Sequence, residues 1–197
     1  MSKKKRDYDL YVVHPRFGQG PLYTGVDVNE GEEVVSLHWL TPRIPGTAIP
    51  AKASNSMIAL THYYDVERKC RDCHRMFIFF AAEQRYWYET LRFPIESDCV
   101  RCYPCRKDQQ RLTRAKNNYD RLYHQKERTV PQTLSMIEYC LELIEANHFS
   151  TNKCTWVRMM CRRISKQFEK NTGTQEEQQK LALLQERVTI LEANTKP

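Results

Sequence analysis

The chain has 197 residues, of which 41% are hydrophobic and 28% are charged, and its formal net charge is +7. A chain of this length and composition can bury one modest core or two small ones, and we expect two units. No apolar run approaches the ~18 residues of a membrane span, and no apolar signal core follows the basic N-terminus. We therefore expect a soluble, cytoplasmic protein.

The N-terminal segment, residues 1–62, is predicted to be a basic tail followed by an irregular, strand-poor arm. The arm is rich in Pro and Gly and has only short apolar runs, such as Val34 to Leu40. We expect Phe17 and Tyr23 to pack against the domain that follows.

Five of the eight cysteines lie between residues 70 and 105 with Cys-x-x-Cys spacing, which favours metal ligation over a redox pair or disulfides. Cys70 and Cys73 form the first pair. The second pair is ambiguous, because Cys99, Cys102 and Cys105 contain two overlapping spacings. We favour Cys102 with Cys105, since a helix-compatible run begins directly after them and a helix N-terminus stabilises thiolates. Cys99 is the alternative ligand. Four cysteines would complete the coordination sphere of one structural Zn²⁺ and leave no open coordination position for catalysis.

The residues around these cysteines predict a small domain over residues 63–107. Val66 to Phe80 places apolar and aromatic residues on both sides of the first pair, which is typical of a hairpin pinned at a metal knuckle. The 28 residues between the pairs leave room for a hairpin and a short helix, which we place at Ala81 to Leu91. Glu83 and Gln84, beside the helix start, are expected to cap or bond backbone rather than act in catalysis.

Several short motifs of this segment are specific in combination. They are Tyr64-Asp-Val-Glu67, Cys70-Arg-Asp-Cys73, Phe77-Ile-Phe-Phe-Ala-Ala-Glu-Gln84, Trp87-Tyr-Glu89 and Cys102-Tyr-Pro-Cys105-Arg106. Together they resemble the probable zinc-ribbon (treble-clef) domain of uncharacterised bacterial proteins, over roughly residues 63–107. The resemblance implies a zinc domain of bacterial origin and no established activity. Residue 74 is His, where glycine commonly follows the knuckle in that family.

The rest of the chain is predicted to be helical, with a basic helix over 108–130, a helical hairpin over 131–170 and an amphipathic helix over 174–193. Thr174 and Glu177 have capping-box spacing at the start of the last helix. Apolar residues recur at intervals of three and four. They are Leu134, Ile137, Leu141 and Ile144, then Val157, Met160, Ile164 and Phe168, then Leu181, Leu184, Val188 and Leu191.

The positive charge is concentrated beside the cysteines, because residues 99–130 carry nine cations and three anions. Phosphate contacts from such a surface would be independent of nucleotide sequence and sensitive to salt. The expected contacts are Arg101, Arg106, Lys107, Arg111 and Arg114. A solvated charged face or a protein-docking face is the alternative interpretation of the same residues.

The sequence therefore predicts an α+β protein, with a small treble-clef zinc domain, an irregular N-terminal arm and a mainly α-helical C-terminal region. The predicted function is that of a non-enzymatic zinc-binding accessory protein that contacts nucleic acid, DNA or RNA. The alternative is an adaptor in which zinc is purely structural and the helices after Pro131 dock a protein partner. Neither function involves a membrane or a small-molecule substrate.

Overall fold

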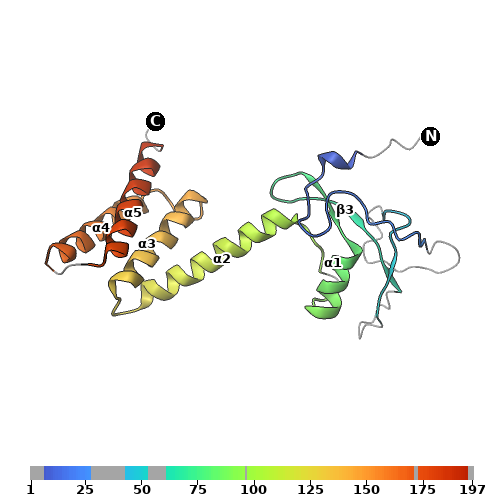
Figure 1. Ribbon diagram of the computed structural model, residues 1–197, viewed down its shortest axis with the longest axis horizontal. Helices are drawn as coiled ribbons and strands as arrows, with labels where there is room; N and C mark the ends of the chain where they lie inside the picture. Colours follow the sequence, from blue (N-terminus) through green and yellow to red (C-terminus); the bar gives the residue numbers. More distant parts are fainter. Residues whose placement is uncertain (1–6, 28–42, 53–60, 96, 171–172, 195–197) are drawn as a thin grey trace. The chain divides into compact units, whose positions relative to one another are not determined.

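The computed structural model describes residues 7–27, 43–52, 61–95, 97–170 and 173–194 (Figure 1). The predicted apolar run Val34 to Leu40 and the first six residues of the basic tail lie outside these ranges. The chain divides into two compact units, Met1–Lys107 and Asp108–Pro197. Among the residues described, no helix is both long enough and apolar enough to span a membrane.

The first unit is built on two short antiparallel strand pairs. β1 (Ile49–Pro50) pairs with β2 (His62–Tyr63), and β3 (Val66–Lys69) pairs with β4 (Met76–Phe79). The register of the second pair joins Val66 to Phe79 and Lys69 to Met76, so its turn is the segment that contains Cys70 and Cys73. β4 is the only strand described between Cys73 and Cys102, and the hairpin of this domain is therefore the one on the knuckle itself.

A short helix follows β4 and is tied to the strands by buried polar groups. α1 (Ala81–Arg85) continues into the π-helical segment η2 (Tyr86–Thr90). Its N-cap has no side-chain cap of its own, but the Ala81 N–H donates to the Asp65 carboxylate over 2.7 Å. The other Asp65 oxygen accepts from the Leu22 N–H, also over 2.7 Å, so this one buried carboxylate joins the arm, the strands and the helix. Gln84 Nε2 donates to the carbonyls of Tyr64 and Phe79, in agreement with its predicted backbone-bonding role.

The apolar core of the first unit is divided into three small clusters rather than one. One surrounds the knuckle cysteines, and another joins Ile44, Ile78 and Phe80, with Phe17 packed against it. The expected packing of Phe17 is therefore observed. The same expectation for Tyr23 is wrong, because this side chain is 68% exposed.

The second unit has a single helical core. It contains α2 (Tyr103–His124) beyond Lys107, α3 (Val130–Glu145), α4 (Lys153–Lys170) and α5 (Gln175–Ala193). Capping boxes at Thr129 and Thr174 start α3 and α5. One cluster of buried residues contains apolar side chains from all four helices, and α5 packs against both α3 and α4. Packing of these stripes is the main source of stability for helices of this length.

The remaining three cysteines belong to this helical core. Cys140, Cys154 and Cys161 are buried free thiols, and burial raises the pKa of Cys140 and of Cys161 to about 11. They therefore behave as small apolar side chains rather than as ligands or nucleophiles.

Candidate metal centre

The first ligand pair lies in the tight turn between β3 and β4. The Cys70 N–H donates to the Arg75 carbonyl over 2.9 Å, and the His74 N–H donates to the Cys70 carbonyl over 3.0 Å. These bonds curl the chain so that the backbone N–H groups of Asp72 and Cys73 donate to the Cys70 sulfur. His74 adopts a left-handed conformation with φ of 58°, a region that favours glycine. The knuckle therefore keeps its turn without the glycine, at some cost in backbone strain.

The second pair lies at the start of α2. The Arg106 N–H donates to the Cys102 carbonyl over 3.0 Å, which makes Cys102 the residue that begins the helical bonding. Its sulfur accepts from the Cys105 N–H, as an N-cap oxygen would. The Cys102 N–H in turn donates to the Cys70 sulfur over 3.4 Å, so the two pairs share a hydrogen bond.

These turns bring four sulfurs to one point. The ligand atoms of Cys70, Cys73, Cys102 and Cys105 all lie within 4.8 Å of one another, and the sulfurs of Cys73 and Cys102 are 3.7 Å apart. A tetrahedron with Zn–S bonds of about 2.3 Å has sulfur–sulfur edges of about 3.8 Å. The cluster therefore has the dimensions of a four-thiolate zinc site. Four ligands of one soft type form a closed structural site with no position for a substrate or water.

The charges of these thiols indicate that a cation belongs among them. Burial opposes ionisation of Cys70, but the N–H groups aimed at its sulfur outweigh burial and lower its pKa to about 6. Burial raises the pKa of Cys102 and of Cys105. Backbone dipoles thus stabilise the Cys70 thiolate, whereas burial opposes ionisation of Cys102 and Cys105. A divalent metal supplies the charge that lets all four bind as thiolates.

Cys99, the alternative ligand, lies outside this group. It is 1% exposed, its thiol donates to the Arg101 carbonyl over 3.3 Å, and burial raises its pKa to about 12. The Arg71 N–H donates to the Val100 carbonyl over 2.9 Å. This bond joins the loop that contains Cys99 to the knuckle. Cys99 therefore packs beside the site while Cys105 completes it.

A largely buried ion pair lies next to the metal centre, with the side chains of Arg106 and Glu83 16% and 9% exposed. Arg106 Nη2 donates to Glu83 Oε1 over 2.6 Å, and its guanidinium lies 5.0 Å from the centre of the Trp87 ring. His14 Nε2 is 3.7 Å from the same Glu83 oxygen, and burial lowers the pKa of His14. Glu83 is structural, as expected, but it acts through this ion pair rather than as a helix cap.

The pairing of Arg106 also removes it from the expected phosphate-binding set, because its side chain faces the interior of the first unit. Among the other four, Arg101 pairs with Asp72 over 2.8 Å, and Arg111 pairs with Glu142. Lys107 and Arg114 are exposed and have no acidic partner among the residues described. Exposed ion pairs contribute only about 0–1 kcal/mol, so Arg101 and Arg111 can exchange partners readily, whereas a buried pair cannot.

A second basic surface was missed by the sequence analysis. The exposed face of α4 carries four cations without an acidic partner among the residues described: Arg162, Arg163, Lys166 and Lys170. Their spacing, read against the buried positions Val157 and Ile164, was a signal that could have revealed them. The concentration of cations in residues 99–130 pointed to the helix that follows the cysteines, and the α4 cations lie beyond that range.

Comparison with known families agrees with this geometry. Residues 64–114 match the family model described as a probable treble clef domain. The chain thus contains a treble-clef domain whose four clustered cysteines form a site for one structural zinc ion. Treble-clef zinc domains are generally non-catalytic. No curated protein and no solved structure shows a significant match to the chain.

Proposed function

We propose that the protein is a non-enzymatic zinc-binding accessory protein that contacts nucleic acid through exposed cations of its second unit. The zinc site supports a structural role for the metal, since its four ligands leave no open position. The observation that carries the nucleic-acid proposal is the basic face of α4.

The basic face of α4 comprises Arg162, Arg163, Lys166 and Lys170, all exposed. At 100° per residue these positions fall within about 100° of one another around the helix. Val157 and Ile164, which are at most 2% exposed, lie on the opposite side in the helical core. The core therefore fixes the direction of the face. The nearest cation on the helix outside the face, Arg158, already pairs with Glu192.

Helix α2 adds a second row of cations in the same unit. Arg111, Arg114 and Arg121 are exposed and fall within about 80° around the helix. The α4 face carries Arg and Lys, and the α2 row carries three Arg, of which Arg111 pairs with Asp108 and Glu142. Such rows suit phosphate groups, which position a nucleic acid without specifying its sequence.

Salt dependence tests the proposal. Each phosphate contact contributes about 0.9 to the slope of log K against log salt concentration on duplex DNA. The variant Arg162→Gln with Lys166→Gln should therefore lower the slope by about 2 and weaken binding at low salt. A matched control, Lys69→Gln with Arg92→Gln, removes the same charge from exposed positions of the first unit. Equal effects of the two variants, or binding that does not respond to salt, would contradict the proposal.

A second candidate function, protein docking, is favoured by one observation on α5. Leu183 and Ile190 are 61% and 52% exposed and lie seven residues apart, so they share a face of the helix. An apolar partner helix could cover them. Under this alternative, Leu183→Gln with Ile190→Gln would abolish a partner interaction that survives nuclease treatment and would leave the salt slope unchanged.

A further inference from the structure

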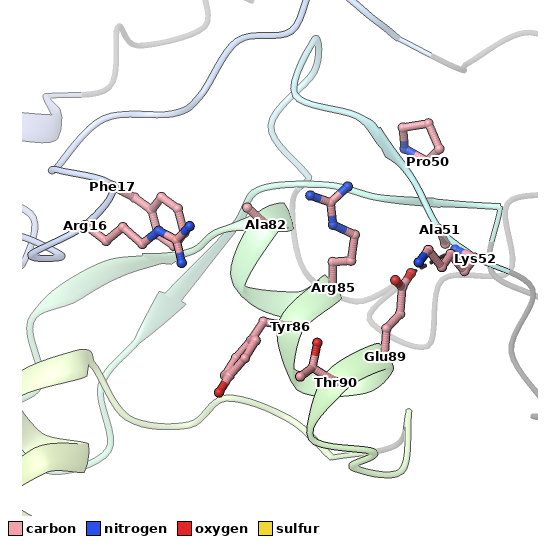
Figure 2. Close-up of a pocket in the computed structure, with 10 residues that line it drawn as sticks. All are labelled: Arg16, Phe17, Pro50, Ala51, Lys52, Ala82, Arg85, Tyr86, Glu89 and Thr90. Atoms are coloured by element: carbon pink, nitrogen blue, oxygen red, sulfur yellow. Dashed lines mark hydrogen bonds between the residues drawn. The ribbon is translucent and has the colours of Figure 1, made fainter.

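The first unit contains a cavity that the metal centre does not use. Its volume is about 590 Å³, within the range of about 300–1,000 Å³ typical of small-molecule sites. Figure 2 shows that three segments line it: the arm at Arg16 and Phe17, the segment from β1 at Pro50 to Lys52, and α1 with η2.

One wall of the cavity is a single helix face. Ala82, Arg85, Tyr86, Glu89 and Thr90 recur at intervals of three and four along α1 and η2, so all five side chains border the same space. The arm opposite is held in place by the buried His14, whose Nδ1 accepts from the N–H groups of Arg16 and Phe17 over 3.2 and 3.3 Å. Hydrogen bonds within the arm and within the helix therefore hold the residues that form these two walls.

The charge of the cavity favours an anion. Arg16, Lys52 and Arg85 line it with a single carboxylate, Glu89. That carboxylate already accepts from the Lys52 N–H over 2.8 Å and from the Tyr63 hydroxyl. No acidic side chain within the described ranges forms an ion pair with Arg16 or Arg85. The two guanidinium groups are thus free to bind a phosphate, for which their planar donor sets are well suited.

An aromatic side chain lines the same cavity, and in Figure 2 its ring extends to the side away from the Arg85 guanidinium. Tyr86 is 51% exposed, directly follows Arg85 and has no other ring from the described residues packed on it. Phe17 positions Arg16, whose guanidinium carbon lies 5.3 Å from the ring centre. Because Arg16, Arg85 and Tyr86 line one cavity, a ligand that fills it can contact all three, with an aromatic ring on Tyr86 and a phosphate at the arginines.

The geometry points to a nucleotide-binding pocket in the first unit, in which Arg16 and Arg85 bind the phosphate and Tyr86 stacks on the base. The nucleotide is either free or a single unit of a single-stranded nucleic acid. This pocket is independent of the proposed function, because none of its residues belongs to α2 or α4.

Binding of AMP, adenosine, ribose 5-phosphate and an eight-residue single-stranded oligonucleotide to the zinc-loaded full chain tests the assignment. Arg85→Gln should weaken the binding of AMP and of ribose 5-phosphate by about tenfold or more, because one charge-assisted contact is lost. Tyr86→Leu should weaken the binding of AMP about fivefold and leave the binding of ribose 5-phosphate unchanged, since only stacking is removed. Arg92→Gln, which removes an exposed cation outside the pocket, is the matched control.

Each result of these binding measurements either supports or overturns the assignment of a nucleotide-binding pocket. AMP binding with these two variant effects supports the pocket with a free nucleotide as ligand. If the oligonucleotide binds, AMP does not, and both variants weaken oligonucleotide binding, the pocket is supported with a single nucleic-acid strand as its ligand. If neither ligand binds, or if Arg85→Gln has no larger effect than Arg92→Gln, the assignment is overturned. Zinc content and circular dichroism of each variant establish that it is folded.

Discussion

Removal of zinc is predicted to unfold the first unit and leave the second folded. The perturbation is a high-affinity chelator added to the full chain. The physical reason is the contrast between the two cores. The first unit distributes its buried apolar residues over three small clusters, one of which includes ligand cysteines, whereas the second unit has one continuous cluster that contains no metal.

The expected size of the effect follows from comparing two free energies. Structural zinc contributes roughly 10–16 kcal/mol to small zinc domains at neutral pH. Whole domains are stable by only about 5–15 kcal/mol. Loss of the metal is therefore comparable to, or larger than, the entire stability of the first unit, and nothing comparable is lost from the second.

Two spectroscopic signals distinguish the units. About four-fifths of the residues in α1, η2 and α2 to α5 belong to the second unit, so at least that share of the helical circular dichroism should remain after chelation. Trp87, packed against Phe79 and the Arg106 guanidinium, should become solvated and shift its fluorescence to the red. Addition of zinc should restore the original fluorescence emission. A loss of more than half the helical signal, or an unchanged Trp87 environment, would refute the reasoning.

Five substitutions make further predictions. Cys105→Ala should abolish stoichiometric zinc binding, whereas Cys99→Ala should retain about one zinc per chain in metal analysis, since only Cys105 belongs to the sulfur cluster; equal zinc loss would contradict this site. Glu83→Gln should lower the free energy of unfolding of the first unit by about 3 kcal/mol in urea, because it leaves the largely buried Arg106 guanidinium without its counter-charge. His74→Gly should raise that free energy by up to about 1 kcal/mol, since relief of left-handed strain exceeds the added chain entropy; a clear destabilisation would show that the strain argument is wrong. Leu141→Ala, at a fully buried position, should cost about 2–5 kcal/mol in the second unit alone, and zinc content should not change.

The sequence by itself determined the features that depend on local chemistry. Two Cys-x-x-Cys pairs can each present two thiols to a metal from one tight turn, and this spacing predicted a four-thiolate site while it left Cys99 as the alternative to Cys105. Two capping boxes start α3 and α5, formed by Thr129 with Gln132 and by Thr174 with Glu177. The two residues of each box are three positions apart, so the sequence reveals the pair directly. The apolar stripes of α3, α4 and α5 follow from helical periodicity, and their burial follows from the need to cover them.

The tertiary structure decided which of several equivalent residues take part. Cys99 and Cys105 have the same spacing from Cys102, and only the fold directs one thiol to a backbone carbonyl and the other to the cluster. Arg106 resembles its basic neighbours in sequence, but its partly buried side chain pairs with Glu83, a partner 23 residues away. Asp65, between β2 and β3, accepts from the first N–H of α1, and residues from three separate segments line the cavity around Arg85. Burial and pairing of this kind depend on long-range contacts, which no local pattern records.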